Sequence, residues 1–353
     1  MPPHRPTIFA TFSGRCLRLL FCLAALAQAQ ASTTVFEFTS RTLEGNPLND
    51  PVKRKVVIFS PAQAATNALL PVMYYLPGFG GSSEGFIQDR ARWERVIQKL
   101  ADDVQPLRWV VVDGRTRWYC SQYIDSPAQG NYATYICNEI VSEVQQREPL
   151  PGSGVRRIIA GHSSGGFGAL RLGMLRPDIF DAVIALSPDS DFPVSHLPLV
   201  RLPGVTNISL AQVQALQTAE RPNPMPTDGD LVYALALSAA YAPRGVAYPG
   251  QFEWLYDRTG AFRPEVWQKW LENDPLTIVR DHPDAFRPEQ AIYLDGARQD
   301  EYKANIGARK IYDVLRARKA RCTFVEPPGK HGDRLPDRLE DGLRWLFRAP
   351  SAH

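Results

Sequence analysis

The stretch from Arg156 to Leu170 constrains the fold of this chain more than any other part of the sequence. It begins as an apolar, β-branched run, passes through a turn of small residues, and continues as a run able to form a helix. The turn over residues 161–165 reads Gly-His-Ser-Ser-Gly and fits the pattern Gly-x-Ser-x-Gly. At such a strand-to-helix turn the glycines permit close approach, and the strained central serine exposes its hydroxyl. We therefore predict that Ser163 is a nucleophile beside a helix N-terminus, which favours negative charge.

Strand and helix patterns alternate along most of the chain. This alternation predicts an α/β fold in which a mostly parallel central sheet carries helices on both faces. The first two strands suggest an antiparallel edge. The predicted strands cover residues 35–40, 53–59, 72–76, 109–113, 182–186, 291–295 and 322–326, besides the strand before Ser163. The predicted helices run through residues 86–100, 131–144, 305–318 and 336–347, besides the helix after Ser163.

The region from about residue 189 to residue 288 breaks this regularity. It follows the strand that ends near Leu186, is rich in Pro and Trp, and contains short helical patterns at 231–240 and 265–271. Because too few strands lie within it, we interpret it as a helical, Pro-rich insertion in one domain that covers residues 32–353. Such an insertion can cover a site and shape access to it. A simple solvated excursion is the alternative.

Residues 1–31 are typical of a cleaved export signal. A basic start, with arginines at positions 5, 15 and 18, leads into an apolar run over residues 17–27 that is too short to span a bilayer. Residues 29–31, Ala-Gln-Ala, fit a small-x-small cleavage pattern, so we predict cleavage after Ala31 and a secreted or periplasmic protein. An uncleaved anchor and a lipid anchor on Cys22 are alternatives. No later segment predicts a membrane span.

Three cysteines remain after such a cleavage: Cys120, Cys137 and Cys322. In an exported protein, Cys120 and Cys137 could form a bridge that stiffens the Tyr-rich loop between them. Three buried free thiols are the alternative. Without histidines at ligand spacing, the three cysteines do not indicate a zinc site.

A serine hydroxyl needs a base to take its proton, and the chain has six histidines. His331 is our candidate because it follows the last predicted strand, and sites form in loops beyond the carboxyl ends of parallel strands. The imidazole in turn needs a carboxylate that fixes its tautomer. Asp300 is favoured because it lies out in the preceding loop, whereas Asp295 is still on a strand end and could only brace that loop. Glu301 is a third and weaker candidate.

An oxyanion formed at Ser163 needs hydrogen-bond donors. We expect the N–H of Ser164 to be one, and the N–H of Phe79, in the glycine-rich loop after the strand at 72–76, to be the other. Aromatic residues near the expected mouth could stack on an acyl group or a sugar, or could belong to the core. The substrate-binding candidates are Trp118, Tyr119 and Tyr132, with Tyr123 beside them.

Four segments resemble the putative esterase family, the esterase D-like branch of the α/β-hydrolases, which includes feruloyl and acetylxylan esterases, S-formylglutathione hydrolases and mycolyltransferases. The resemblance implies an α/β-hydrolase fold with Ser163, Asp300 and His331 as the catalytic triad, and the donors at Phe79 and Ser164. Pro77 stands where the family often has His, and Ala297 where Gly is usual. The segments are 74–81, 130–136, 161–166, and 295–301 together with 329–332.

These observations predict an exported serine esterase that hydrolyses carboxylic esters through an acyl-enzyme. An acyltransferase that uses the same triad with an alcohol or sugar acceptor is the nearest alternative, and a catalytically inactive binding module is a remote one. We expect no cofactor and no metal. The net charge of +3 is too small to indicate nucleic acid as a partner. The expected partner is a small-molecule or carbohydrate-linked ester, and the oligomeric state is left open.

Overall fold

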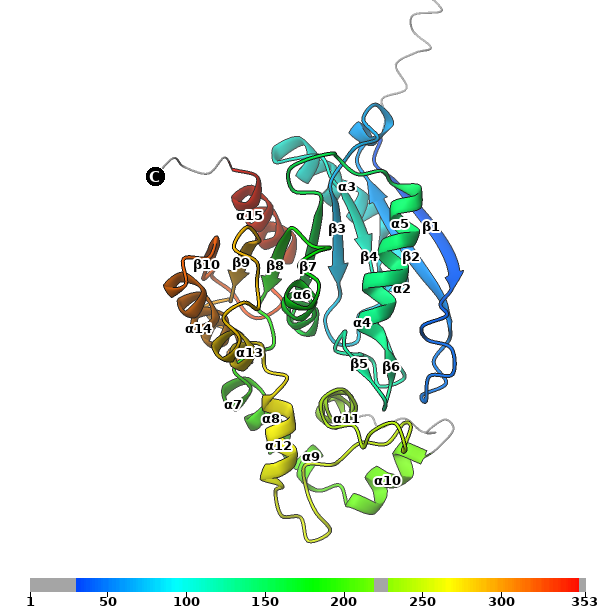
Figure 1. The fold of residues 1–353 in the computed structure, drawn as a ribbon, viewed down its shortest axis with the longest axis vertical. Coiled ribbons are helices and arrows are strands. Elements are labelled where there is room, and N and C mark those ends of the chain that lie inside the picture. Colours follow the sequence, from blue (N-terminus) through cyan, green and yellow to red (C-terminus); the bar gives the residue numbers. More distant parts are fainter. Residues whose placement is uncertain (1–29, 219–227, 349–353) are drawn as a thin grey trace, which may run out of the picture.

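The computed structural model describes residues 30–218 and 228–348, so nearly all of the predicted signal peptide lies outside the described residues. An eight-stranded sheet forms its centre, in the order β1-β2-β4-β3-β7-β8-β9-β10 (Figure 1). β2 pairs antiparallel with β1 and β4, and the other neighbouring strands pair parallel. The predicted sheet, with its antiparallel edge, is confirmed. The strands are β1 (Ser32–Thr39), β2 (Lys53–Ser60), β3 (Val72–Leu76), β4 (Arg108–Val111), β7 (Arg157–His162), β8 (Ala182–Leu186), β9 (Ala291–Asp295) and β10 (Cys322–Val325).

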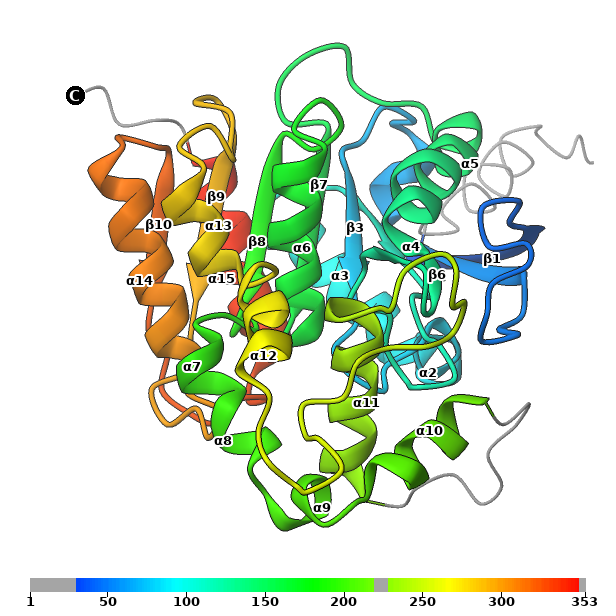
Figure 2. The ribbon, with the colours of Figure 1, turned by 60° about the horizontal axis from the view of Figure 1, so that its bottom comes forward.

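Helices cover both faces of the sheet, as predicted. Side chains of a strand point alternately to the two faces, and in β3 Tyr74 packs with one apolar cluster while Tyr75 packs with another. In Figure 2, α14, α13, α6 and the α4–α5 segment lie in front of the sheet, and α15 and α3 lie behind it. These helices are α2 (Ser83–Gln88), α3 (Arg90–Asp103), α4 (Tyr132–Thr134), the π-helical η2 (Tyr135–Ile140), α5 (Val141–Arg147), α6 (Ser164–Leu175), α13 (Pro275–Asp281), α14 (Ala304–Ala317) and α15 (Leu335–Phe347).

Two helices differ in detail from the sequence prediction. The helix predicted over residues 86–100 is divided at Asp89 into α2 and α3. Asn131 does precede α4, but its side chain makes no capping hydrogen bond. The Asp125 carboxylate, in the short hairpin β5–β6 (Asp125–Ser126 and Gly130–Asn131), accepts instead from the Thr134 N–H at 2.9 Å.

The insertion between β8 and β9 packs against α6 and against loops of the rest of the chain. Its helices lie below the ends toward which the parallel strands point (Figure 1). They share an apolar cluster that also takes in Phe167 of α6, with Tyr241 and Trp270 fully or almost fully buried. The insertion therefore forms a wall next to the carboxyl edge of the sheet. Its elements before α13 are α7 (Phe192–Ser195), α8 (Leu197–Val200), α9 (Pro203–Thr206), α10 (Leu210–Thr218), α11 (Gly229–Tyr241) and α12 (Pro264–Leu271).

None of the helices within residues 30–218 and 228–348 combines the length and apolarity that crossing a bilayer requires.

Candidate functional site

Ser163 occupies the sharp turn between β7 and α6. Its φ of 59° and ψ of −126° are rare for a residue with a side chain, so the backbone is strained here. The Ser163 N–H donates to the carbonyl of Leu186 at 3.0 Å, and its own carbonyl accepts from Phe167 in the first turn of α6. The neighbouring strand and helix thus hold a conformation that the sequence alone would not favour.

The glycines of this turn are required because the backbone segments approach too closely for a side chain. A Cβ at Gly165 would lie 1.8 Å from the carbonyl oxygen of Leu76 in β3. A Cβ at Gly161 would lie 2.2 Å from the carbonyl oxygen of Gly165. The close approach inferred from the Gly-x-Ser-x-Gly pattern is present, and it fixes Ser163 against β3 and the loop that follows.

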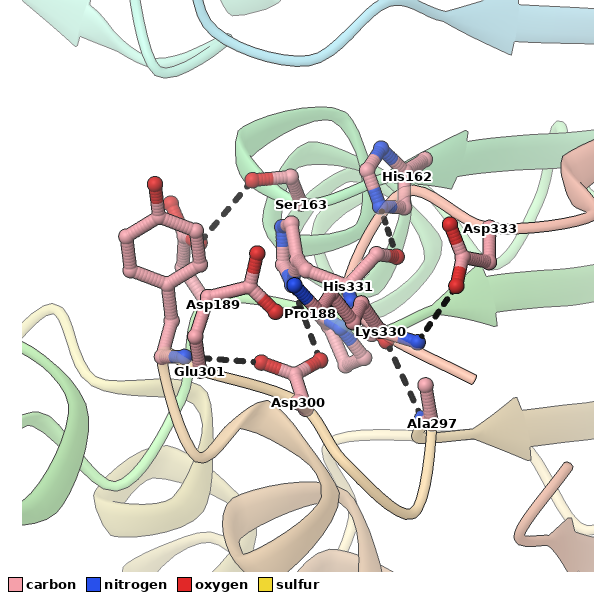
Figure 3. A network of polar contacts seen from close by, with 12 residues as sticks. His162, Ser163, Pro188, Asp189, Ala297, Asp300, Glu301, Lys330, His331 and Asp333 are labelled. Carbon is pink, nitrogen blue, oxygen red and sulfur yellow. Dashed lines mark hydrogen bonds and ion pairs between the residues drawn. The ribbon is translucent and has the colours of Figure 1, made fainter. Parts of the chain in front are cut away.

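His331 is hydrogen bonded to Asp300, with 2.8 Å between Nδ1 and Oδ2. Because a carboxylate only accepts, Nδ1 is protonated, and in the neutral imidazole Nε2 has a free lone pair. Burial acts to raise the pKa of Asp300, but the hydrogen bond and charge of His331 outweigh it and leave that pKa below its ordinary value. Asp300 therefore stays a carboxylate, and Figure 3 shows His331 between it and Ser163.

Asp295 has a different partner. It is fully buried and forms a two-pronged ion pair with Arg338, with nitrogen–oxygen distances of 2.6 and 2.8 Å. It also accepts from the Ser187 N–H at 2.9 Å. Of the two aspartates that the sequence left open, the structure joins Asp300 to His331 and uses Asp295 to tie β9 to α15 and to the loop after β8.

The backbone of His331 is held from both sides. Its N–H donates to the carboxylate of Glu301 at 3.0 Å, and its carbonyl accepts from Arg338 at 2.8 Å and from Nε2 of His162 at 2.9 Å. Burial, then the neighbouring His331 and Arg338, lower the pKa of His162 to about 3, so this imidazole is neutral. These contacts of Glu301 and His162 were not predicted from the sequence, because both join segments that are far apart in it.

A cavity of about 380 Å³ contains Ser163 and His331 in its wall. The Ser163 hydroxyl points to Oδ1 of Asp189, at a long 3.5 Å (Figure 3). No hydrogen bond joins Ser163 to His331 within the described residues. Turning about one side-chain bond is enough to redirect a serine hydroxyl, and hydrogen bonds at such sites often tighten only when substrate binds.

The two predicted oxyanion donors lie beside Ser163. Phe79 lines the cavity, and Gly78 before it comes so close to the turn that a Cβ there would be 3.4 Å from the Ser163 Cβ. Within the described residues, the Phe79 N–H makes no hydrogen bond. Ser164 is the first residue of α6, and N–H groups at this position have no acceptor within their own helix. Both N–H groups are therefore free to donate.

The predicted substrate-binding aromatics divide into two groups. Trp118 and Tyr132 are fully buried and do not line the cavity, so in this structure they offer no surface to a substrate. Trp118 packs in the apolar cluster of the insertion, and the Tyr132 hydroxyl is bonded to Asp50 at 3.0 Å and to Arg54 at 2.7 Å. Tyr119 is partly exposed and its ring packs edge-on against Phe79, which does line the cavity.

Cys120, Cys137 and Cys322 are free thiols, so the bridge considered from the sequence is not formed. Burial raises the pKa of both Cys120 and Cys137 to about 12, which keeps them as unreactive thiols. Across residues 30–218 and 228–348, no three or more His, Cys, Asp or Glu side chains gather as metal ligands would.

The insertion supplies cavity residues that the sequence analysis missed. Asp189 follows β8, and its Oδ2 accepts from the hydroxyls of Ser164 at 2.8 Å and Tyr233 at 2.7 Å. His196 and Tyr233 line the same cavity. No local pattern marks these residues, because the fold of an irregular segment decides which of its side chains reach the site. Only the placement of Asp189 directly after a predicted strand could have drawn attention to it.

Comparison with known proteins agrees with this architecture. The model of the family described as putative esterase matches residues 51–324, most of the chain. A ferulic acid esterase of known structure is 18% identical, with a TM-score of 0.59 over 90% of this chain and 98% of its own. An S-formylglutathione hydrolase from Agrobacterium tumefaciens is 16% identical, with a TM-score of 0.56 over 90% of this chain and 95% of its own.

A third structure is the fluorophosphonate-binding serine hydrolase F of Staphylococcus aureus, which is 16% identical with a TM-score of 0.56, over 90% of this chain and 98% of its own. At such low identities the likeness speaks for the fold, and the predicted α/β-hydrolase fold is confirmed. The family match spans well over half of the sequence. The chain therefore belongs to the putative esterase family.

Proposed function

We propose that this protein is a serine hydrolase of carboxylic esters, with Ser163 as nucleophile, His331 as general base and Asp300 as the acid that orients it. The observation that carries the proposal is the 2.8 Å hydrogen bond from His331 Nδ1 to Asp300, in a histidine that lines the same cavity as Ser163. This bond holds a ring proton on Nδ1, so that in the neutral imidazole Nε2 is able to accept a proton. The partly exposed serine on a strained turn supplies a hydroxyl from which to take it.

In the first half of the reaction, Ser163 Oγ attacks the ester carbonyl carbon while its proton passes to His331 Nε2. The carbonyl electron pair moves onto oxygen, and the N–H groups of Phe79 and Ser164 stabilise that charge. When the tetrahedral adduct collapses, the bond to the alcohol oxygen breaks and the imidazolium returns the proton to it. The alcohol leaves and an acyl-serine remains.

In the second half, water takes the place of the alcohol. His331 Nε2 accepts one proton from the water as its oxygen attacks the acyl carbon. The second tetrahedral adduct then collapses, the bond from the acyl carbon to Ser163 Oγ breaks, and Nε2 returns the proton to that oxygen. The acid product leaves and the enzyme is restored. Throughout, the Asp300 carboxylate stabilises the imidazolium without taking up its proton.

The experiment that tests the proposal is the Ser163→Ala substitution, with hydrolysis of p-nitrophenyl acetate and covalent labelling by a fluorophosphonate as readouts. Loss of both in a protein with wild-type circular dichroism is expected. As a matched control, Ser142→Ala changes a serine on α5, away from the cavity, and should leave both unchanged. Turnover or labelling that survives in Ser163→Ala would remove Ser163 from the mechanism.

We also propose that the chain is exported and cleaved after Ala31. The basic start, the short apolar run and the Ala-Gln-Ala pattern of residues 29–31 support this proposal. Mass spectrometry of protein secreted by an expressing cell is expected to give a mature N-terminus at Ser32. An intact N-terminus on protein recovered from the cytosol would contradict it.

A further inference from the structure

The wall of the cavity carries two hydrogen-bond acceptors that the protein uses poorly, one with only a long contact and one with no partner among the described residues. Asp189 is 7% exposed and His196 is 2% exposed, and both line the cavity. Burying a polar atom without a partner is costly, so such atoms call for a physical explanation. We call Asp189 and His196 the acceptor pair.

At Asp189 the two carboxylate oxygens are used unequally. Oδ2 accepts from the Ser164 and Tyr233 hydroxyls at 2.8 and 2.7 Å. Oδ1 has only the long 3.5 Å contact from the Ser163 hydroxyl, and under the proposed mechanism that hydroxyl turns to His331. Oδ1 therefore faces the reacting atoms with its acceptor capacity unused.

At His196 the unsatisfied atom is Nε2, which is buried and without a hydrogen-bond partner within the described residues. The Ser195 hydroxyl lies 2.9 Å from the carbonyl oxygen of Ser190 and 3.0 Å from His196 Nδ1. Because a carbonyl can only accept, the hydroxyl hydrogen goes to Ser190, and Ser195 Oγ accepts from Nδ1–H. Burial lowers the pKa of His196, so the ring is neutral and Nε2 is a bare acceptor.

The charge of the cavity also favours a hydrogen-bond donor over an anionic group. Among its described lining residues, Asp189 and Asp230 are carboxylates and none is Lys or Arg. Asp230 lies at the exposed start of α11. A carboxylate on a substrate would meet repulsion here, whereas a hydroxyl or an ammonium group would meet a favourable potential.

We propose that the acceptor pair is a subsite for a hydrogen-bond donor, a hydroxyl or an ammonium group, that lies next to the scissile ester. Because Asp189 Oδ1 lies close to Ser163 Oγ, the donor group of the substrate should stand one or two bonds away from its reacting carbonyl. The subsite selects hydroxylated or cationic esters and disfavours anionic ones. This inference rests on the proposed esterase function and names the substrate class of that site.

The test compares esters of equal size. Ethyl glycolate, glycine ethyl ester and ethyl propionate differ only in whether a hydroxyl, an ammonium or a methyl group stands beside the ester carbonyl, and monoethyl malonate adds a carboxylate. On the alcohol side, 2-hydroxyethyl butyrate is paired with propyl butyrate. Each kcat/KM is divided by the rate of alkaline hydrolysis, which removes intrinsic reactivity. We expect the hydroxylated members to exceed their methyl partners about 2- to 10-fold, the ammonium ester about 10- to 100-fold, and the malonate to be poorest.

Variants assign the preference to the acceptor pair. His196→Phe keeps the stack on Phe192, whose ring lies 4.3 Å away, but removes Nε2, and is expected to reduce the hydroxyl preference because only Asp189 Oδ1 then remains as acceptor. Asp189→Asn removes the charge at nearly constant volume and is expected to abolish the ammonium preference. Leu199→Met, an apolar change in the same wall, should leave both ratios at their wild-type values.

A measurement on the wild-type protein covers the case in which these variants do not fold. Ethylene glycol is expected to raise KM for ethyl propionate competitively, whereas 1,2-dimethoxyethane, which cannot donate, should not. If plain esters are cleaved but normalised rates are equal within each pair, or the preferences survive in both variants, the subsite is wrong and the esterase stands. If no ester is cleaved and fluorophosphonate does not label Ser163, the proposed function itself fails.

Discussion

At the scale of single residues, this site contains groups whose backbone conformation or pKa is unusual. Ser163 keeps a positive φ of 59°, and His162 stays neutral because burial, His331 and Arg338 lower its pKa to about 3. Two buried aspartates look alike in the sequence, yet one is bonded to His331 and the other to Arg338. These differences in partner predict different consequences of mutation.

Asp300→Asn and Asp295→Asn should separate catalysis from stability. Asp300→Asn is expected to lower kcat by about 10³- to 10⁴-fold with little change in Tm, because it disturbs the tautomer of His331. Asp295→Asn leaves Arg338 buried without its counter-charge and should cost about 3–5 kcal/mol of unfolding free energy. Ester hydrolysis and urea denaturation measured on both variants check this. Equal kinetic losses would argue against Asp300 as the sole partner of His331.

His162→Gln should flatten the dependence of stability on pH. The pKa of His162 falls from an ordinary 6.5 to about 3 in the folded protein, so between these values the unfolded chain binds more protons. Stability is therefore full above pH 6.5 and is lost as the pH falls, by at most about 1.4 kcal/mol per pH unit. The amide of glutamine does not titrate, and it can donate to the His331 carbonyl. Denaturation curves from pH 7 to pH 4 test this, and parallel losses in both proteins would exclude His162 as the cause.

At the scale of elements, the turn between β7 and α6 is the tightest junction in the site. It brings α6 against β3 so closely that no side chain fits at the flanking glycines. The loop after β3 then reaches the same point with Gly78 and Phe79, and the loop after β8 brings Asp189. Three neighbouring parallel strands therefore deliver their following loops to one place, as expected at the carboxyl edge of such a sheet.

Gly165→Ala should disrupt this junction, because the added Cβ would lie 1.8 Å from the Leu76 carbonyl oxygen. We expect a loss of more than about 4 kcal/mol, or no soluble protein, together with loss of ester hydrolysis. Gly85→Ala in α2 is the matched control: a Cβ there meets nothing within 4 Å, and alanine favours a helix by about 0.5–1 kcal/mol. Thermal unfolding of both variants decides it. A Gly165→Ala protein of wild-type Tm and activity would contradict the close approach.

At the scale of the whole molecule, the insertion packs against elements that belong to the rest of the chain. Phe167 of α6 belongs to the apolar cluster of the insertion, and Phe79 packs partly against that cluster and partly against the sheet. Tyr233 of α11 bonds to Asp189 at 2.7 Å, so the insertion also completes the cavity. Loss of packing in the insertion should therefore also disturb the cavity at Ser163.

Trp270→Ala tests this coupling. Trp270 is fully buried in the insertion and packs against Tyr241 at 5.6 Å between ring centroids. Its removal should cost about 3–5 kcal/mol and lower ester hydrolysis, with fluorescence and far-ultraviolet circular dichroism still reporting one coincident transition. Val246→Ala, at a side chain that is 88% exposed, should change little. Two separated transitions would mean that the insertion unfolds on its own.

Local sequence patterns were sufficient to predict the alternation of strands and helices, the antiparallel edge and the turn at Ser163. These features depend on neighbours along the chain: side-chain periodicity within a strand, and the need for glycine where backbones touch. The sequence also identified Asp300 and His331 as candidates, because both follow predicted strands whose carboxyl ends lie at one edge of the sheet. It favoured Asp300 over Asp295 only through the position of Asp300 in a loop.

The surroundings of Ser163 could not be predicted from local sequence patterns. The burial of Trp118 and Tyr132, the contacts of Glu301 and His162 with His331, and the positions of His196 and Tyr233 arise from packing between segments far apart in the sequence. An irregular insertion has no period from which to infer the side chains that turn inward. Their choice follows from how its apolar residues bury themselves against α6 and one another, which is a property of the folded molecule.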